Sequence, residues 1–100
     1  MVYNFKVGDY VRNNCHTAYF NTNSLIEEWM KKNCSNKYLF DRWIQRGAPD
    51  EGECGTIMFM AETVLFGEVV MLMYFLTDNG DGYIVDKDNF WGALYVPDEE

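Results

Sequence analysis

The most regular feature of the chain is a run of eight apolar residues, 69–76, followed by a cluster of turn residues, 77–82, and a second short apolar stretch. A run this short, with glycines at both boundaries, is typical of a strand buried on both faces rather than of a helix. The Asn-Gly and Asp-Gly dipeptides inside the turn favour a hairpin, because they accept positive φ. The pattern therefore predicts a β-hairpin within residues 67–91, whose first strand lies in the core.

A helical period replaces the strand pattern in residues 24–46. Ser24 and Glu27 have the spacing of a capping box, which predicts a helix starting at Leu25. A second helix is predicted over residues 37–46, capped by Ser35 or Asn36 and ended by the glycine and proline that follow. The apolar positions expected to face the core are Leu25, Ile26, Trp29, Met30, Leu39, Phe40, Trp43 and Ile44.

Three further strands are predicted around these elements. The first follows a turn at Gly8 and Asp9, the second covers residues 54–60 after a turn at 50–53, and the last lies within residues 90–97. Residues 61–67 are expected to form a loop or an extension of the central hairpin.

The phrase Phe-x-Val-Gly-Asp-x-Val-Arg at residues 5–12, with Gly-Thr-Ile at 55–57 and Tyr-Ile-Val at 83–85, resembles strands of small SH3-like barrels, including KOW-type modules. The resemblance implies a curled five-stranded sheet and no particular function. The chain departs from it between residues 13 and 53, where those barrels usually have a short loop. The fold prediction is a single α+β domain over residues 1–100: a strongly bent antiparallel sheet of about five strands, with a two-helix insertion (24–46) after the first strand.

Length and composition agree with one folded domain. The chain has 100 residues, of which 48% are hydrophobic and 17% aromatic, and this composition excludes intrinsic disorder. The N-terminal residues lack the pattern of an export signal, which predicts a cytoplasmic location. The apolar segment 56–76 contains Glu62 and Glu68, whose charges disfavour a membrane span.

Charge is divided unevenly along the chain. The net charge is -8, and residues 51–100 contain eleven acidic residues and one lysine, whereas residues 1–50 contain five acidic and seven basic residues. An acidic surface repels phosphates and attracts cationic proteins. We therefore expect a basic protein partner, and neither direct nucleic-acid binding nor membrane binding. The alternative is that the acidity serves solubility alone.

Residues 77–88 resemble an EF-hand calcium loop at its third, fifth, sixth and eighth places. The first ligand place holds Thr77 and the twelfth holds Asp88 in place of the bidentate glutamate. Both flanks have the pattern of strands, so a hairpin turn is the favoured interpretation. No calcium requirement is predicted.

The chain has three cysteines, Cys15, Cys34 and Cys54, and one histidine, His16. Their number and spacing fit free thiols better than a disulfide framework or a zinc site. No nucleophile-base pair, phosphate loop or dinucleotide fingerprint is present. The sequence therefore predicts no catalytic residue, no metal and no cofactor.

These observations favour a non-enzymatic binding protein of the inhibitor type, such as a phage anti-defence (anti-CRISPR-like) or toxin-immunity protein, whose partner is a basic nucleic-acid-binding protein. Aromatic side chains commonly anchor such interfaces. The predicted partner-binding residues are Asp78, Asp81, Tyr83, Asp86, Asp88 and Trp91.

Two alternatives remain open at the level of sequence. One is a KOW-like nucleic-acid or ribonucleoprotein-binding module that uses basic residues in and near the insertion. Those residues are Arg12, Lys31, Lys32, Lys37, Arg42 and Arg46. The other is a small hydrolytic or ligand-binding domain with a pocket between the insertion and the sheet.

Overall fold

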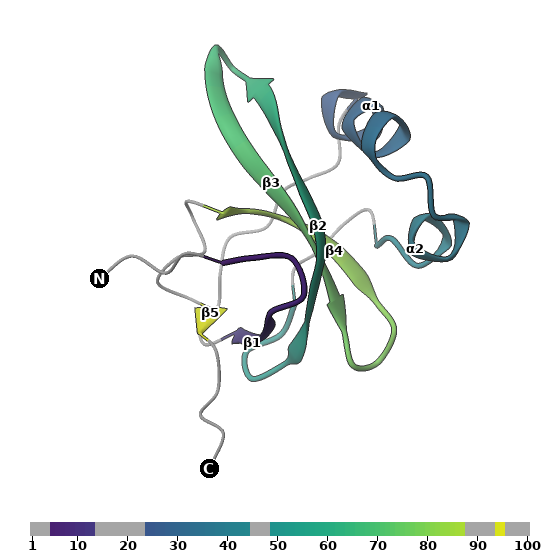
Figure 1. The fold of residues 1–100 in the computed structure, drawn as a ribbon, viewed down its shortest axis with the longest axis vertical. Coiled ribbons are helices and arrows are strands. Elements are labelled where there is room, and N and C mark those ends of the chain that lie inside the picture. The colour runs from purple at the N-terminus through teal and green to yellow at the C-terminus, as the bar shows by residue number, and fades with distance from the viewer. Residues whose placement is uncertain (1–4, 14–23, 45–48, 88–93, 96–100) are drawn as a thin grey trace.

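A computed structural model of the chain describes residues 5–13, 24–44, 49–87 and 94–95 (Figure 1). Within these residues the fold is mixed α+β: a curled antiparallel sheet in the order β4-β3-β2-β1, with two helices beside it. The elements are β1 (Tyr10–Asn13), α1 (Ser24–Asn33), α2 (Lys37–Asp41), β2 (Cys54–Leu65), β3 (Glu68–Thr77) and β4 (Gly82–Asp86).

A two-residue strand, β5 (Leu94–Tyr95), pairs antiparallel with the free side of β1. The α+β class and the bent antiparallel sheet are confirmed, and both helices lie in the connection between β1 and β2 as predicted. Four longer strands and this two-residue pairing do not establish an SH3-like barrel of about five strands. The barrel stays a prediction.

The hairpin of β2 and β3 is the largest feature of the sheet, and it extends beyond the other strands in Figure 1. Of the two expectations for residues 61–67, the extension of the hairpin is confirmed, because β2 continues to Leu65 and the turn consists of Phe66 and Gly67 alone. Both turn residues have positive φ, 53° and 81°. A two-residue turn of this kind matches the right-handed twist of the strands, so the pairing continues to the end of the hairpin.

β3 is buried on both of its faces, as predicted from its unbroken apolar run. Met73 and Phe75 point into a cluster within the curl of the sheet, and Leu72 and Tyr74 point into a second cluster beneath the helices. All four side chains are 0% exposed. The first cluster comprises Phe5, Val11, Ile57, Met73, Phe75 and Val85. The second comprises Ile26, Trp29, Met30, Leu39, Trp43, Leu65, Leu72, Tyr74 and Ile84.

The curl of the sheet coincides with an irregularity in β2. The register against β3 shifts between Ile57, which lies opposite Phe75, and Phe59, which lies opposite Tyr74. An extra residue in one strand bends that strand and increases its twist. The shift lets Ile57 face the inner cluster while Phe59 packs toward the helices.

α1 is held against the sheet by Trp29. Its ring stacks on Phe59 with a centroid distance of 5.4 Å, and its Nε1–H donates to the carbonyl of Ala61 at 3.2 Å. Trp29 is 3% exposed, so its predicted core position is confirmed. Leu25 was expected on the same buried face but is 41% exposed.

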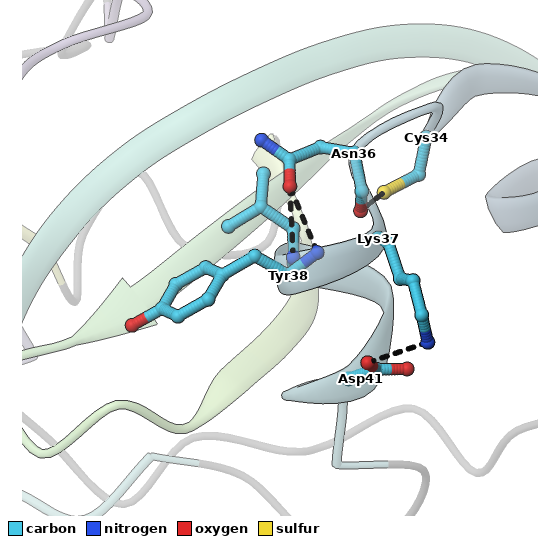
Figure 2. A network of polar contacts seen from close by, with 6 residues as sticks. Cys34, Asn36, Lys37, Tyr38 and Asp41 are labelled. Carbon is cyan, nitrogen blue, oxygen red and sulfur yellow. Dashed lines mark hydrogen bonds and ion pairs between the residues drawn. The ribbon is translucent and has the colours of Figure 1, made fainter.

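α2 is shorter than predicted, because it ends at Asp41 rather than Arg46. Asn36 caps it as expected: its side chain accepts hydrogen bonds from the backbone N–H groups of Tyr38 and Leu39 (Figure 2). After Asp41 the chain instead pairs with the edge of β4. The N–H of Gly82 donates to the carbonyl of Arg42 at 2.9 Å, and the N–H of Ile44 donates to the carbonyl of Gly82 at 2.7 Å. These sheet bonds replace the helical bonds that a longer α2 would make.

The buried hydroxyl of Tyr74 connects β3, α2 and β4. It donates to the carbonyl of Leu39, and the phenol lies directly against Gly82. A Cβ atom at position 82 would lie 1.9 Å from that hydroxyl oxygen, so glycine is required there. Trp43 is 9% exposed in the same cluster, which confirms its predicted core position.

Burial of Tyr74 has a testable consequence at alkaline pH. Burial raises the pKa of its hydroxyl above the ordinary value of about 10, because the charged phenolate is disfavoured in the core. A group whose pKa is raised on folding contributes stability below its unfolded pKa, and that stability is lost as the pH rises toward the folded value. We expect the free energy of unfolding to fall above about pH 10, measured by denaturant titration at several pH values. The free energy of unfolding of Tyr74→Phe should fall less over this pH range than that of the wild type. An equal fall in both proteins would show that Tyr74 is not the group responsible.

Candidate functional site

Two turns meet at one end of the sheet. Residues 50–53 precede β2 and residues 77–82 connect β3 to β4, and the antiparallel pairing of Gly55 with Thr77 places them side by side. The N–H of Asp78 donates to the carbonyl of Cys54 at 2.9 Å. The side-chain amide of Asn79 lies 3.4 Å from a carboxylate oxygen of Glu53.

The carboxylates of these two turns form what we call the acidic end. Its members are Asp50, Glu51, Glu53, Asp78 and Asp81. Asp50, Glu51 and Asp78 are exposed, and Glu53 and Asp81 are half-buried. The first turn is closed by Glu53, whose side chain accepts from the N–H of Asp50 at 2.8 Å, and whose N–H donates to the carbonyl of Asp50 at 3.1 Å. Carboxylates from two distant parts of the sequence thus share one surface.

The pKa of Tyr83, at the start of β4, responds to the negative charge of this end. Burial raises the pKa of its hydroxyl, and the negative charges of Glu53, Asp81 and Asp50 raise it further. Neighbouring anions disfavour a second anion, so all three carboxylates act on the same point. The ring is half-buried against the inner cluster.

Tyr10 of β1 lies beside the second turn. Its hydroxyl donates to Oδ2 of Asp78 at 2.6 Å, and the ring is 44% exposed. This hydrogen bond is the largest cause of the raised pKa of Tyr10, and a contact with Cys54 adds to it. The acidic end therefore offers two tyrosines among its carboxylates, which supplies aromatic surface as well as charge.

The structure brings three of the predicted partner-binding residues together: Asp78, Asp81 and Tyr83. Asp86 lies at the opposite end of β4, paired with Leu72, and is only 7% exposed. Its predicted place on the binding surface is corrected: alternation along β4 directs it into the fold, away from the two turns. Asp88 and Trp91 lie outside the described residues.

Sequence reasoning missed Asp50 and Tyr10. Asp50 is 28 residues from Asp78 in the sequence, and the only signal that relates them is the register of β2 against β3. A two-residue hairpin turn at Phe66 and Gly67, once assumed, would have placed residue 55 opposite residue 78, one position from its observed partner Thr77, because the irregularity between Ile57 and Phe59 shifts the register by one residue. Tyr10 follows from the pairing of β1 with β2, in which Tyr10 lies opposite Thr56.

A cavity of about 410 Å³ borders the acidic end, between α2 and the turn at residues 77–82. Its lining is Tyr38, Asp41, Arg42, Ile44, Gly80 and Asp81. The guanidinium of Arg42 stacks over the ring of Tyr38 at 4.5 Å, and Nη1 lies 3.5 Å from the carbonyl of Gly80. The ligand-binding alternative expected a pocket between the insertion and the sheet, whereas this cavity lies between the insertion and the turn at residues 77–82.

The described residues contain no group of three histidine, cysteine or acidic side chains arranged to hold a metal ion. Cys34 and Cys54 are free thiols, both half-buried. Cys15 and His16 lie outside the described residues. The predicted calcium-like loop is the turn between β3 and β4, in which the hydroxyl of Thr77 accepts a hydrogen bond from the N–H of Asp81 at 3.1 Å.

Comparison with known proteins gives no relative: no family model, curated protein or solved structure matches the chain. Within the part of the chain that the structure describes, no helix is long and apolar enough to cross a membrane. We therefore infer function from the residues of the chain itself.

Proposed function

We propose that this protein is a non-enzymatic binding protein whose acidic end docks on a basic protein partner. The observation that supports the proposal is that strand pairing places the carboxylate-bearing turns 50–53 and 77–82 side by side, where the amide of Asn79 lies 3.4 Å from a carboxylate oxygen of Glu53. Like charges held close together repel each other, and cationic side chains of a partner would relieve this repulsion. Tyr10 and Tyr83 would supply the aromatic anchors of the interface.

A nucleic-acid-binding protein is the partner class that this surface fits best. The phosphate-binding face of such a protein carries Lys and Arg side chains, and clustered carboxylates can occupy the positions that phosphates otherwise take. The net charge of -8 would also increase the association rate over a long range. These properties support an inhibitor role of the anti-CRISPR-like or toxin-immunity kind, carried out in the cytoplasm.

The scaffold that we propose for this surface is an SH3-like barrel. The order β4-β3-β2-β1, the additional pairing of β1 with β5, and the irregularity that bends β2 support it. In this arrangement the insertion that carries α1 and α2 replaces the connection between the first two strands. Because many unrelated functions use such barrels, the barrel supports the fold assignment alone.

The KOW-like alternative would use the basic side chains of the helical insertion. Lys31 and Lys32 are exposed at the end of α1. Lys37 is paired with Asp41 at 3.0 Å, and Arg42 is packed on Tyr38, so two of the basic side chains already have contacts within the fold. Arg46 lies outside the described residues. The charges of the acidic end favour the first proposal, and charge reversal at each surface separates the two.

The decisive experiment compares charge reversal at the two surfaces. The Asp78→Lys/Asp81→Lys double variant should slow association with a partner captured from lysate of the source organism by about tenfold or more. Glu28→Lys, at an exposed position of α1, is the matched control for the single variant Asp78→Lys, which changes the net charge by the same amount, and Glu28→Lys should change the rate little. Association of the wild type should also weaken as salt is raised, measured by surface plasmon resonance.

The opposite pattern would overturn the proposal. If the double reversal leaves the association rate unchanged while Lys31→Glu/Lys32→Glu abolishes binding, the basic insertion is the working surface. A salt-independent rate in the wild type would also argue against docking through the acidic end.

A further inference from the structure

The end of the β2–β3 hairpin carries an apolar surface that the fold does not use. Val64 and Val69 lie opposite each other across the two strands and are 59% and 65% exposed. Phe66, in the turn, is 88% exposed. We call Val64, Phe66 and Val69 the hairpin tip. Figure 1 shows it at the far end of the long axis from the turns of the acidic end.

The two faces of the hairpin differ near the tip. Leu65 points to the face that packs beneath the helices and is 6% exposed. Val64 and Val69 point to the other face, because side chains alternate along a strand. The apolar character of Leu65 is thus explained by core packing, whereas the exposed valines are not.

Phe66 is also an unusual residue for its backbone conformation. Its φ is 53°, in the left-handed region, and a turn with two positive φ values favours Asn, Asp or Gly at its first position. Phenylalanine has no local hydrogen bond to offer there, and an 88% exposed ring contributes little packing. Neither turn chemistry nor the core accounts for an aromatic side chain at this position.

The charges around the tip decide what can cover it. Glu62 lies two residues before Val64 on the same face of β2, whereas Glu68 lies opposite Leu65 and points to the other face of the hairpin; both are exposed. A second copy of the chain would bring these carboxylates together and add to the repulsion of two chains of charge -8. An anionic membrane surface is disfavoured by the same carboxylates.

We propose that the hairpin tip inserts into an apolar pocket of a partner protein, whose rim carries Lys or Arg side chains opposite Glu62 on one face of the hairpin and opposite Glu68 on the other. Phe66 enters the pocket, and Val64 and Val69 cover its edge. The site is independent of the acidic end, because the end of the hairpin lies far from the two turns along the long axis (Figure 1). Either surface can therefore fail its test without affecting the other.

The first arm of the test needs no partner. Phe66→Asn gives the turn the residue that it favours, so the melting temperature should rise by a few degrees, measured by differential scanning calorimetry. Gly67→Ala, at the second turn position with φ 81°, should lower it and shows that the assay responds to this turn. A fall in melting temperature for Phe66→Asn would mean that the ring serves the fold, and would overturn the proposal.

The second arm identifies the occupant. A photo-reactive benzoyl-phenylalanine is placed at position 66 and, as the control, at position 7, where Val7 is 57% exposed. Each protein is irradiated in lysate of the source organism, and the crosslinked residues are mapped by mass spectrometry. The expected result is a crosslink from position 66 to apolar residues of one protein, bordered by Lys or Arg, that is lost in Glu62→Lys/Glu68→Lys. Crosslinks to lipid, crosslinks to a second copy, or a pattern no different from position 7 would each overturn the proposal.

Discussion

Replacing Gly55 with alanine should lower the free energy of unfolding by about 3 kcal/mol or more. A Cβ atom at this position would lie 2.3 Å from the carbonyl oxygen of Leu76 and 2.8 Å from the Cα of Thr77. Both obstacles are backbone atoms of β3, the strand with the most buried side chains. A methyl group can enter only if β2 and β3 separate where they begin to curl, so the cost includes hydrogen bonds and core contacts.

Gly52→Ala is the matched control for this change. Gly52 has φ of 91° but no atom within 4 Å of the position that a methyl group would take, so alanine there meets backbone strain without a clash. Its cost should be about 1–2 kcal/mol. Both variants are measured by denaturant unfolding, followed by circular dichroism. A cost for Gly55→Ala no larger than that for Gly52→Ala would contradict the close approach of β2 and β3.

Trp29→Ala should lower the free energy of unfolding by about 3–5 kcal/mol. The change removes the stacking on Phe59 and leaves a cavity between α1 and the sheet. It also removes the hydrogen bond from Nε1 to the carbonyl of Ala61. Because α1 contacts the sheet chiefly along β2, we further expect its amide protons to exchange faster than those of β3.

Leu25→Ala tests the same helix from its exposed side. Leu25 is 41% exposed, so its removal should cost well under half as much as the removal of Trp29. Hydrogen exchange measured by mass spectrometry and denaturant unfolding give the two readouts. If Trp29→Ala costs no more than Leu25→Ala, the helix is not anchored through the tryptophan.

The elements with strong local signals could be predicted from the sequence. The turn at residues 77–82 and the cap at Asn36 have side chains that favour one backbone geometry, and the structure has both where they were expected. The buried run in β3 followed from its unbroken apolar character. Trp29 and Trp43 were placed in the core because each sits on the apolar side of a helical pattern.

The errors have a common cause, which is competition from distant contacts. Residues 42–44 continue the helical pattern of α2, yet they pair with Gly82, which no local rule indicates. Phe66-Gly67 is a poor turn sequence by composition, so the sequence did not decide whether residues 61–67 form a loop or extend the hairpin. The prediction of the candidate site was incomplete for a related reason. Asp78, Asp81 and Tyr83 are neighbours in sequence, whereas Asp50 and Tyr10 join them only through strand register.

The pairing of Gly82 with residues 42–44 has a consequence for self-association. In the sheet order, β4 is the outermost strand on its side, and the unpaired backbone groups of such a strand offer a template for growth by other chains. Both backbone groups of Gly82 are already bonded to Arg42 and Ile44. A foreign strand therefore cannot pair with β4 at Gly82, the residue with which that strand begins.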